Sequence, residues 1–271
     1  MLRLRYHGTS PIPIEADCLT PDNLAGKSLA EIAALPVQHG NRTEPLGAFF
    51  DIDGDSADRE IRIDGDCSKV KRIGLAMNSG RIVASGNVGM HVGAELSGGE
   101  LVVEGDASDW IGAEMTGGRI HVHGSAGNLA GAAYRGSRRG MRGGVLLIDG
   151  NAGRELGATM RRGLIAVGGS VGDFAGANLI AGSIFLFGRP GVRFGAGMKR
   201  GTVALLGESA EVLPTFAAAC DYAPVFLSLY LRKLAAWGFG PAAAAGRAVR
   251  CRRYVGDLAS LGKGEILIRR E

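Results

Sequence analysis

The chain has 271 residues, enough to bury a substantial core, and its formal net charge is only +4. No uninterrupted apolar stretch reaches the roughly 20 residues that a membrane-spanning helix needs, and no signal-peptide pattern opens the chain. The four cysteines are scattered without a C-x-x-C pair, so we expect a cytoplasmic protein with reduced thiols and no membrane contact.

The 45 glycines are unevenly spread, because 34 of them lie within residues 65–207. The flanks on either side therefore differ in kind from the middle of the chain. We predict three parts: an N-terminal cap over residues 1–60, a β-helix repeat domain over 61–207, and a C-terminal helical cap and tail over 208–271.

The N-terminal cap carries one clear helix signal. Ser28 stands three residues before Glu31, which is the spacing of a capping box. The helix that it opens must end near Pro36, because proline cannot continue a helix. We therefore expect a short helix between Ser28 and Pro36.

Glycine recurs at a fixed period through the middle of the chain. Five of six successive steps are 19 residues long, and the step from Gly124 to Gly150 is 26. Each unit opens with a short alternating apolar run, as in residues 81–84, which predicts a half-buried strand. The glycines of the series are Gly86, Gly105, Gly124, Gly150, Gly169, Gly188 and Gly207.

The length of the unit limits the fold. Nineteen residues with several tight turns are too few for a strand–helix–strand unit and fit one coil of a solenoid, whose stacked coils share a continuous core. We predict an all-β core, a right-handed parallel β-helix of about seven coils between short capping segments that contain helices. Its inward-facing ladder should contain Ile82, Leu101, Ile120, Leu146, Ile165 and Ile184.

The 26-residue coil breaks the period, and its extra residues are basic. The seven inserted residues are about Tyr134 to Gly140, and residues 135–142 hold four arginines and no acid. The equivalent corners of two later coils are also basic, whereas the corner between them, 179–182, is neutral. Because equivalent positions stack along one edge of a solenoid, we predict a basic ridge that binds an anionic substrate tail or other anion. It comprises Arg135, Arg138, Arg139, Arg142, Arg161, Arg162, Lys199 and Arg200.

The basic ridge has the chemistry of a polyanion site. Closely spaced cations repel one another unless an anion lies between them, and arginine binds carboxylate or phosphate in a bidentate manner. A row of cations suits a poly-γ-glutamyl tail, a nucleic acid or the acidic loop of a partner protein. The alternative is an edge that only keeps the protein in solution.

Two histidines alternate on one strand of the repeat. His121 and His123 share a face because successive side chains of a strand point to opposite sides. Glu104 and Asp149 could lie on the neighbouring coils, but no other acid or cysteine stands at ligand-like spacing. We expect an outward, solvated pair and assign no metal site. Since no nucleophile elbow or dinucleotide-binding fingerprint occurs either, we assign no catalytic residue.

The C-terminal cap combines a predicted helix with excess basic charge. Residues 231–253 contain no acid, so this segment is either a docking face for an acidic partner or a solvated helix face. Four large side chains at helical spacing predict a packed helix that ends at Gly238: Phe226, Tyr230, Leu234 and Trp237. The basic residues are Arg232, Lys233, Arg247, Arg250, Arg252 and Arg253.

The coils and the tail together resemble a known family. The pattern G-x-x-G-x-x-x-G-A, at residues 86–94 and 188–196, resembles the glycine-repeat domain shared by the glutamate synthase large subunit and the C subunit of formylmethanofuran dehydrogenase. The tail RYVGDLASLGKGEIL, residues 253–267, and the overall length resemble that C subunit as a free-standing chain. Within the family, the chain is most similar to the C subunit of the bacterial formyltransferase/hydrolase complex.

The resemblance implies a non-catalytic member of an enzyme complex in one-carbon metabolism. Such a complex moves a formyl group between tetrahydromethanopterin and a methanofuran-type carrier and releases formate. Its hydrolase-like, formyltransferase and B-type subunits would be the partners. No covalently bound cofactor is expected, and the polyglutamyl tail of the carrier would contact this chain. The placement of that tail on the basic ridge is an inference from the repeat and not a family motif.

Two other functions remain open at this point. The chain could be the C subunit of a molybdenum or tungsten formylmethanofuran dehydrogenase, which the same resemblance implies. It could also be a nucleic-acid-binding module, although Tyr134 is the only aromatic residue near the basic ridge that could stack on a base.

Overall fold

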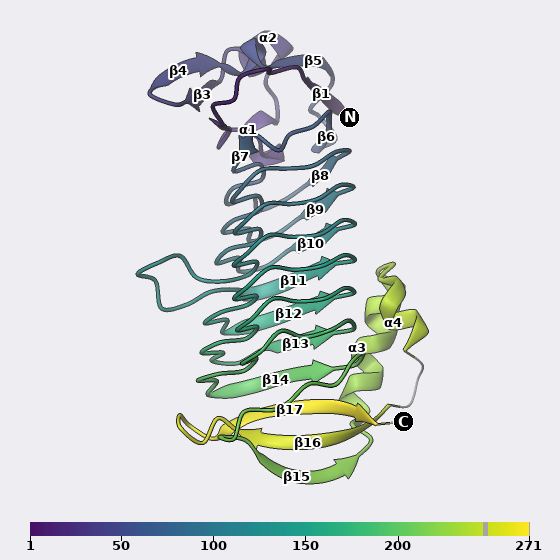
Figure 1. Cartoon of the computed structure of the whole chain (residues 1–271). Helices are drawn as coiled ribbons and strands as arrows, with labels where there is room; N and C mark the ends of the chain where they lie inside the picture. The colour runs from purple at the N-terminus through teal and green to yellow at the C-terminus, as the bar shows by residue number, and fades with distance from the viewer. Residues whose placement is uncertain (246–248, 271) are drawn as a thin grey trace.

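The computed structural model describes residues 1–245 and 249–270, and β-strands are its dominant regular structure. Figure 1 shows a tall stack of coils, each of which adds one strand to a common sheet of 13 strands. The N-terminal segments lie at one end of this stack, and the C-terminal strands and helices lie at the other. None of the described helices has the length and apolar character that crossing a membrane requires.

The middle of the sheet consists of parallel strands from successive coils. Each strand pairs with the strand of the coil before it and the coil after it, so the spatial order follows the chain. The strands are β6 (Glu60–Asp64), β8 (Arg81–Ala84), β9 (Glu100–Val103), β10 (Arg119–Val122), β11 (Arg142–Ile148), β12 (Arg162–Val167), β13 (Ser183–Leu186) and β14 (Arg200–Leu205).

The register of these strands follows the glycine period. Ile82 pairs with Leu101 and Leu101 with Ile120, at offsets of 19 residues, and Ile120 pairs with Leu146 across the longer coil. The ladder continues through Ile165 and Ile184, and each of its members is fully buried. The predicted inward ladder is therefore confirmed. A second line of parallel bridges joins the coils at Cys67, Val88, Ala107, Ala126, Ala152 and Val171.

Glycine serves the repeat for two different reasons. A Cβ atom added to Gly169 would lie 2.7 Å from the carbonyl oxygen of Gly150, so the glycines of the period allow adjacent coils to approach closely. Gly157, by contrast, has a φ of 62°, a left-handed conformation that residues with a Cβ atom disfavour. The fixed period thus combines close approach at one corner with left-handed turns at another.

The N-terminal residues cover the first coil and build a small second sheet. β1 (Leu2–Tyr6) pairs in parallel with β6 and antiparallel with β5 (Phe50–Gly54), so the start of the chain extends the stack. The second sheet contains β2 (Ile14–Glu15), β3 (Pro36–His39), β4 (Arg42–Pro45) and β7 (Val70–Lys71). Helical turns α1 (Pro21–Leu24), α2 (Leu29–Ala33) and η1 (Leu46–Ala48) connect these strands.

The predicted helix of the N-terminal cap is present as α2. Ser28 Oγ accepts a hydrogen bond from the backbone N–H of Glu31, and the Glu31 carboxylate accepts one from the backbone N–H of Ser28 at 2.8 Å. These two bonds form the predicted capping box. The helix ends before Pro36, where β3 begins.

The C-terminal residues extend the sheet by three strands. β17 (Lys263–Arg270) pairs in parallel with β14, and β16 (Arg250–Gly256) and β15 (Ala217–Tyr222) continue antiparallel. The sequence led us to expect only a helical cap and tail here. The repeat could not reveal these strands, because β17 joins β14 from outside the 19-residue series and covers the open edge that a stack would otherwise leave.

Two helices cover the outward face of the later coils. α3 (Val225–Ala236) and α4 (Gly240–Ala244) lie beside the lower half of the stack in Figure 1. Leu234 is fully buried in a cluster with Leu147 of β11 and Phe185 of β13, and Phe226 and Trp237 pack against it partly buried. The predicted packing is wrong for Tyr230, which is 37% exposed, because the buried side of α3 is made by Leu227, Leu231 and Leu234. The C-terminal half thus has apolar cores on both sides of its sheet.

Candidate functional site

The basic residues at the starts of the later strands lie close to one another in register. Arg142 at the start of β11 pairs with Arg162 at the start of β12, and Arg200 begins β14. Between them, β13 has no charged residue at the equivalent corner, so the neutral gap expected from the sequence is present. Arg161 and Lys199 precede two of these strands, and all five side chains belong to exposed residues.

The inserted residues project from the stack as a loop. The backbone N–H of Ala133 donates a hydrogen bond to Ala158 O, and that of Gly140 donates one to Thr159 O. The chain therefore leaves the regular coil after residue 133 and returns to it at residue 140. Figure 1 shows this loop standing away from the coils beside β11. It carries Arg135, Arg138 and Arg139, all exposed. The basic ridge therefore has two parts, a projecting loop and a row along the stack.

The cations of the basic ridge lack counter-ions in the part of the chain that the structure describes. Within residues 1–245 and 249–270, none of its eight side chains takes part in a salt bridge. On the earlier coils, by contrast, Arg81 of β8 and Arg119 of β10 both contact Glu100 of β9, at 3.4 Å and 2.5 Å. A row of exposed, unneutralised cations has the electrostatic character of a site for an anionic ligand or partner.

The structure adds one cation that the sequence pattern did not indicate. Lys263 opens β17 and pairs with Arg200 in the register of β14 and β17, and its side chain is exposed. It therefore extends the row of cations beyond the last regular coil. The period could not reveal it, because Lys263 lies far outside the repeat and reaches the ridge only through the tail strand.

Of the basic residues of 231–253 that the structure describes, Arg252 and Arg253 form salt bridges, whereas Arg232 and Arg250 are exposed and form none. Arg252 forms a bidentate pair with Asp221 of β15, and Arg253 contacts Glu265 of β17 at 2.9 Å. Lys233 lies over the ring of Trp237, with its ammonium nitrogen 5.0 Å from the ring centroid. Arg247 lies outside the described residues. These pairs tie the C-terminal strands together and leave fewer cations for a partner.

An aromatic corner anchors the inserted loop. The ring of Tyr134 lies 5.5 Å from His91 and 6.5 Å from Trp110, and His91 stacks on Trp110 at 5.3 Å. The Tyr134 hydroxyl is 3.2 Å from His91 Nδ1, and the backbone N–H of Tyr134 donates to Glu114. The sequence contained a signal for this corner, because His91 and Trp110 are 19 residues apart and therefore equivalent in adjacent coils.

Burial at this corner changes the ionisation of both polar rings. Desolvation lowers the pKa of His91, with the positive charges of Arg72 and Lys71 acting in the same direction. Desolvation also raises the pKa of Tyr134 to about 12. Both rings are therefore neutral near pH 7, and the first residue of the loop is held by ring packing and by its hydrogen bonds to His91 and Glu114.

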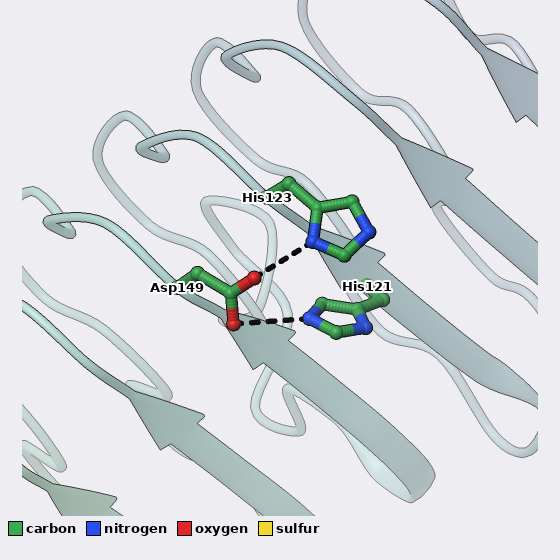
Figure 2. A group of neighbouring side chains, drawn as sticks. All are labelled: His121, His123 and Asp149. Carbon is green, nitrogen blue, oxygen red and sulfur yellow. Dashed lines mark hydrogen bonds and ion pairs between the residues drawn. The ribbon is translucent and has the colours of Figure 1, made fainter. Parts of the chain in front are cut away.

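His121 of β10 and His123, which directly follows that strand, differ in burial. His123 is exposed, but His121 is buried, so the prediction of an outward, solvated pair is wrong for His121. Figure 2 shows both rings pointing toward the carboxylate of Asp149. His121 Nε2 lies 3.0 Å from Asp149 Oδ1, and His123 Nδ1 lies 2.7 Å from Asp149 Oδ2.

The strand register explains this arrangement. Val122 pairs with Ile148, which places Asp149, the next residue of the longer coil, beside His123. His121 pairs with Leu147, and Leu147 belongs to the apolar cluster under α3 and α4. The helices that cover the later coils thus begin at the level of His121, which the repeat alone could not indicate.

The Asp149 carboxylate is stabilised as an anion. Burial opposes its ionisation, but hydrogen bonds from His121 and His123 and the attraction of both rings outweigh that effect. As a result the pKa of Asp149 lies below its usual range. Two ring nitrogens and one carboxylate therefore converge in a compact cluster at the end of two strands.

The glycine repeat matches a known family model. Residues 61–225, more than half of the chain, match the family described as GXGXG motif. The matched range covers the parallel strands from β6 to β14 and ends at the start of α3. The family match thus covers the coils and leaves out most of the N-terminal segment and the last strands, β16 and β17.

Curated relatives match part of the chain. A stretch of 85 residues is 47% identical to the C subunit of molybdenum-containing formylmethanofuran dehydrogenase 1 from Methanosarcina barkeri, covering 30% of this chain and 28% of the relative. A stretch of 82 residues is 50% identical to the same subunit from Methanothermobacter thermautotrophicus, covering 30% of this chain and 20% of the relative. The matches therefore span less than a third of these relatives.

A solved structure matches the whole chain. A chain of the formyltransferase/hydrolase complex from Methylorubrum extorquens, crystallised with methylofuran, is 36% identical, with a TM-score of 0.91. The match covers 99% of this chain and 100% of that chain, so it includes both ends as well as the coils. Together with the GXGXG match, this shows that the chain belongs to the family of C subunits found in formylmethanofuran dehydrogenases and the formyltransferase/hydrolase complex.

Proposed function

We propose that this chain is the C subunit of a formyltransferase/hydrolase complex of one-carbon metabolism. The observation that carries the proposal is the full-length match, at 36% identity and a TM-score of 0.91, to a chain of such a complex. The complex moves a formyl group between tetrahydromethanopterin and a methanofuran-type carrier and releases formate. The hydrolase-like, formyltransferase and B-type subunits are its partners, and the chain assembles them without performing the chemistry.

The proposed scaffold is a right-handed parallel β-helix. The 19-residue register of β8 to β10 and the second line of bridges at the equivalent corners support coils that close on a common core. Residues 1–60 and 208–271 act as the caps of residues 61–207, because a stack with open ends would expose unpaired strands. Such a stack is stiff along its length and can hold partner subunits at fixed separation.

The basic ridge is the proposed contact for the anionic tail of the carrier. Arg142, Arg162, Arg200 and Lys263 align along the stack, and the projecting loop adds three further arginines. Arginine suits carboxylates because its planar guanidinium donates two parallel hydrogen bonds. A tail held here keeps the reactive end of the carrier near more than one active site, which raises its effective concentration at each.

The proposed compartment is the cytoplasm. All four cysteines are free thiols, and Cys67 is fully buried with its pKa raised by burial to about 12. Unpaired thiols are typical of a reducing compartment.

Purification under native conditions tests the membership in a complex. The chain should elute with larger partner proteins, and the isolated assembly should transfer and hydrolyse a formyl group without molybdenum, tungsten or a pterin cofactor. A stable monomer with no partners would contradict the proposal. Stoichiometric molybdenum or tungsten in the assembly would instead identify it as a formylmethanofuran dehydrogenase.

A further inference from the structure

We propose that His121, His123 and Asp149 form a binding site for a divalent first-row transition metal, with Zn²⁺ as the best fit. The three side chains come from the ends of β10 and β11 and converge on one point (Figure 2). Their ligand atoms all lie within 4.8 Å of one another. The site is separate from the basic ridge and does not depend on the proposed function of the chain.

The donor set has the chemistry of such a site. Two imidazole nitrogens and one carboxylate are a recurrent set of three protein ligands for Zn²⁺, with further positions taken by water or another ligand. A hard cation such as Mg²⁺ or Ca²⁺ would instead need a shell made mostly of oxygen atoms. Two of the three ligands here are nitrogens, which favours the transition metal.

The distances require little movement. Zn²⁺ binds nitrogen and oxygen at about 2.0–2.2 Å, so neighbouring ligand atoms of a tetrahedral site lie about 3.3 Å apart. The carboxylate oxygens of Asp149 are 3.0 Å from His121 Nε2 and 2.7 Å from His123 Nδ1. Each nitrogen–oxygen distance would have to increase by about 0.3–0.6 Å to admit the ion. Each ring would then keep its proton on the nitrogen that does not bind the metal.

Burial and rigidity favour a defined geometry. The His121 side chain is only 8% exposed, and the two histidine rings lie 4.2 Å apart on one strand. Val122 between them is fully buried in the inward ladder, so the strand cannot rotate to separate the rings. His123 is 45% exposed, which leaves the metal accessible from solvent. His121 lies on the paired strand β10, and His123 and Asp149 directly follow the last paired residues of β10 and β11, which limits their movement.

The nearest cation on the same strand is neutralised. Arg119, two residues before His121, is paired with Glu100 at 2.5 Å. Glu104, on the preceding coil, is already engaged, because its carboxylate lies 3.7 Å from the guanidinium of Arg62. On β10, whose residues the structure describes in full, no unpaired lysine or arginine would therefore repel a metal cation bound by the three ligands.

Metal titration of the full chain tests the site. Protein without a polyhistidine tag is stripped with a chelator and titrated with Co²⁺ and then Zn²⁺ near pH ~7.5, where imidazole is mostly neutral. We expect one metal ion per chain, measured by calorimetry, and a visible Co²⁺ spectrum without a thiolate charge-transfer band. The result that would overturn the proposal is the absence of stoichiometric binding.

Single substitutions assign the ligands. His123→Ala and Asp149→Asn should each weaken Zn²⁺ binding more than about tenfold, because loss of even an outer-sphere partner has an effect of this size. His7→Ala is the matched control, since His7 has the same exposure of 45% and should leave binding unchanged. Cys220→Ser, which removes an exposed thiol, should also bind normally. Circular dichroism establishes that each variant is folded, and unchanged affinity in His123→Ala and Asp149→Asn would refute the site.

Discussion

At the scale of single residues, Asp257 ties the tail to the last coil. Its carboxylate accepts a hydrogen bond from the backbone N–H of Gly197 at 2.8 Å and another from Ala259 at 2.9 Å, and the residue is 5% exposed. Burial opposes ionisation, but these donors outweigh it and hold the pKa of Asp257 below its usual range. The Asp257 carboxylate is therefore ionised in the folded protein at neutral pH.

Replacement of Asp257 should have a pH-dependent effect on stability. A depressed folded-state pKa contributes stability above the unfolded value, about 3.9, and this contribution disappears as the pH falls through the folded value. Asp257→Asn should lower the free energy of unfolding by about 1.5–3 kcal/mol at neutral pH. The difference from wild type should narrow below pH ~4 in urea denaturation.

The control for this prediction is Asp53→Asn, on the exposed face of β5. It should change the free energy of unfolding by less than about 0.5 kcal/mol. A deficit in Asp257→Asn that is equally large at acidic and neutral pH would show that the ionised carboxylate is not what stabilises the tail.

The cluster of His121, His123 and Asp149 marks the limit of sequence reasoning at this scale. The 26-residue step from His123 to Asp149 places them on neighbouring coils, so their proximity could be anticipated. The burial of His121 could not, because it depends on how far α3 and α4 extend over the outward face of the sheet. Helix placement follows from tertiary packing, which the local pattern does not encode.

At the scale of secondary-structure elements, the coils stack through glycine. Gly169 donates a backbone hydrogen bond to Gly150 O at 2.8 Å, and its Cα faces the backbone of that residue. An added Cβ would lie 2.7 Å from the same oxygen and 2.8 Å from the carbonyl carbon. Because these atoms are backbone, the two coils would have to separate.

Gly169→Ala should therefore destabilise the stack. Overpacking of this kind costs about 1–3 kcal/mol, which should be seen as a lower free energy of unfolding in urea. Gly240→Ala is the matched control, because a Cβ there meets nothing within 4 Å and the residue does not have the left-handed conformation. Equal stability of Gly169→Ala and wild type would disprove the close approach of the coils.

The elements differ in how well the sequence could predict them. The strands from β8 to β14 follow from alternation and the glycine period, and α2 follows from its capping box. β15 and β17 could not be predicted, since their partners are distant in sequence and nothing in the repeat specifies them. Local patterns encode the register between coils, whereas the closure of the ends depends on long-range pairing.

At the scale of the whole molecule, the charges are distributed in a way that suits a scaffold. Carboxylates neutralise the arginines of the early coils, as Glu100 does between Arg81 and Arg119. The basic ridge on the later coils has no such partners within the described residues. The period predicted which residues lie at these corners, but not that the inserted arginines stand on a separate loop anchored by Tyr134.

The most direct test of the proposed carrier site is the dependence of KM on tail length in the assembled complex. The combined Arg138→Ala, Arg139→Ala and Arg142→Ala variant should raise the KM for a long-tailed carrier about tenfold, because each exposed ion pair contributes up to about 1 kcal/mol. The KM for a short-tailed carrier should change little, so the advantage of the long tail should disappear.

The matched control replaces three exposed arginines outside the ridge, Arg5, Arg42 and Arg270, with alanine. It removes the same charge and should keep the wild-type dependence on tail length. If the ridge variant assembles normally and retains the wild-type KM for both carriers, the basic ridge does not hold the tail.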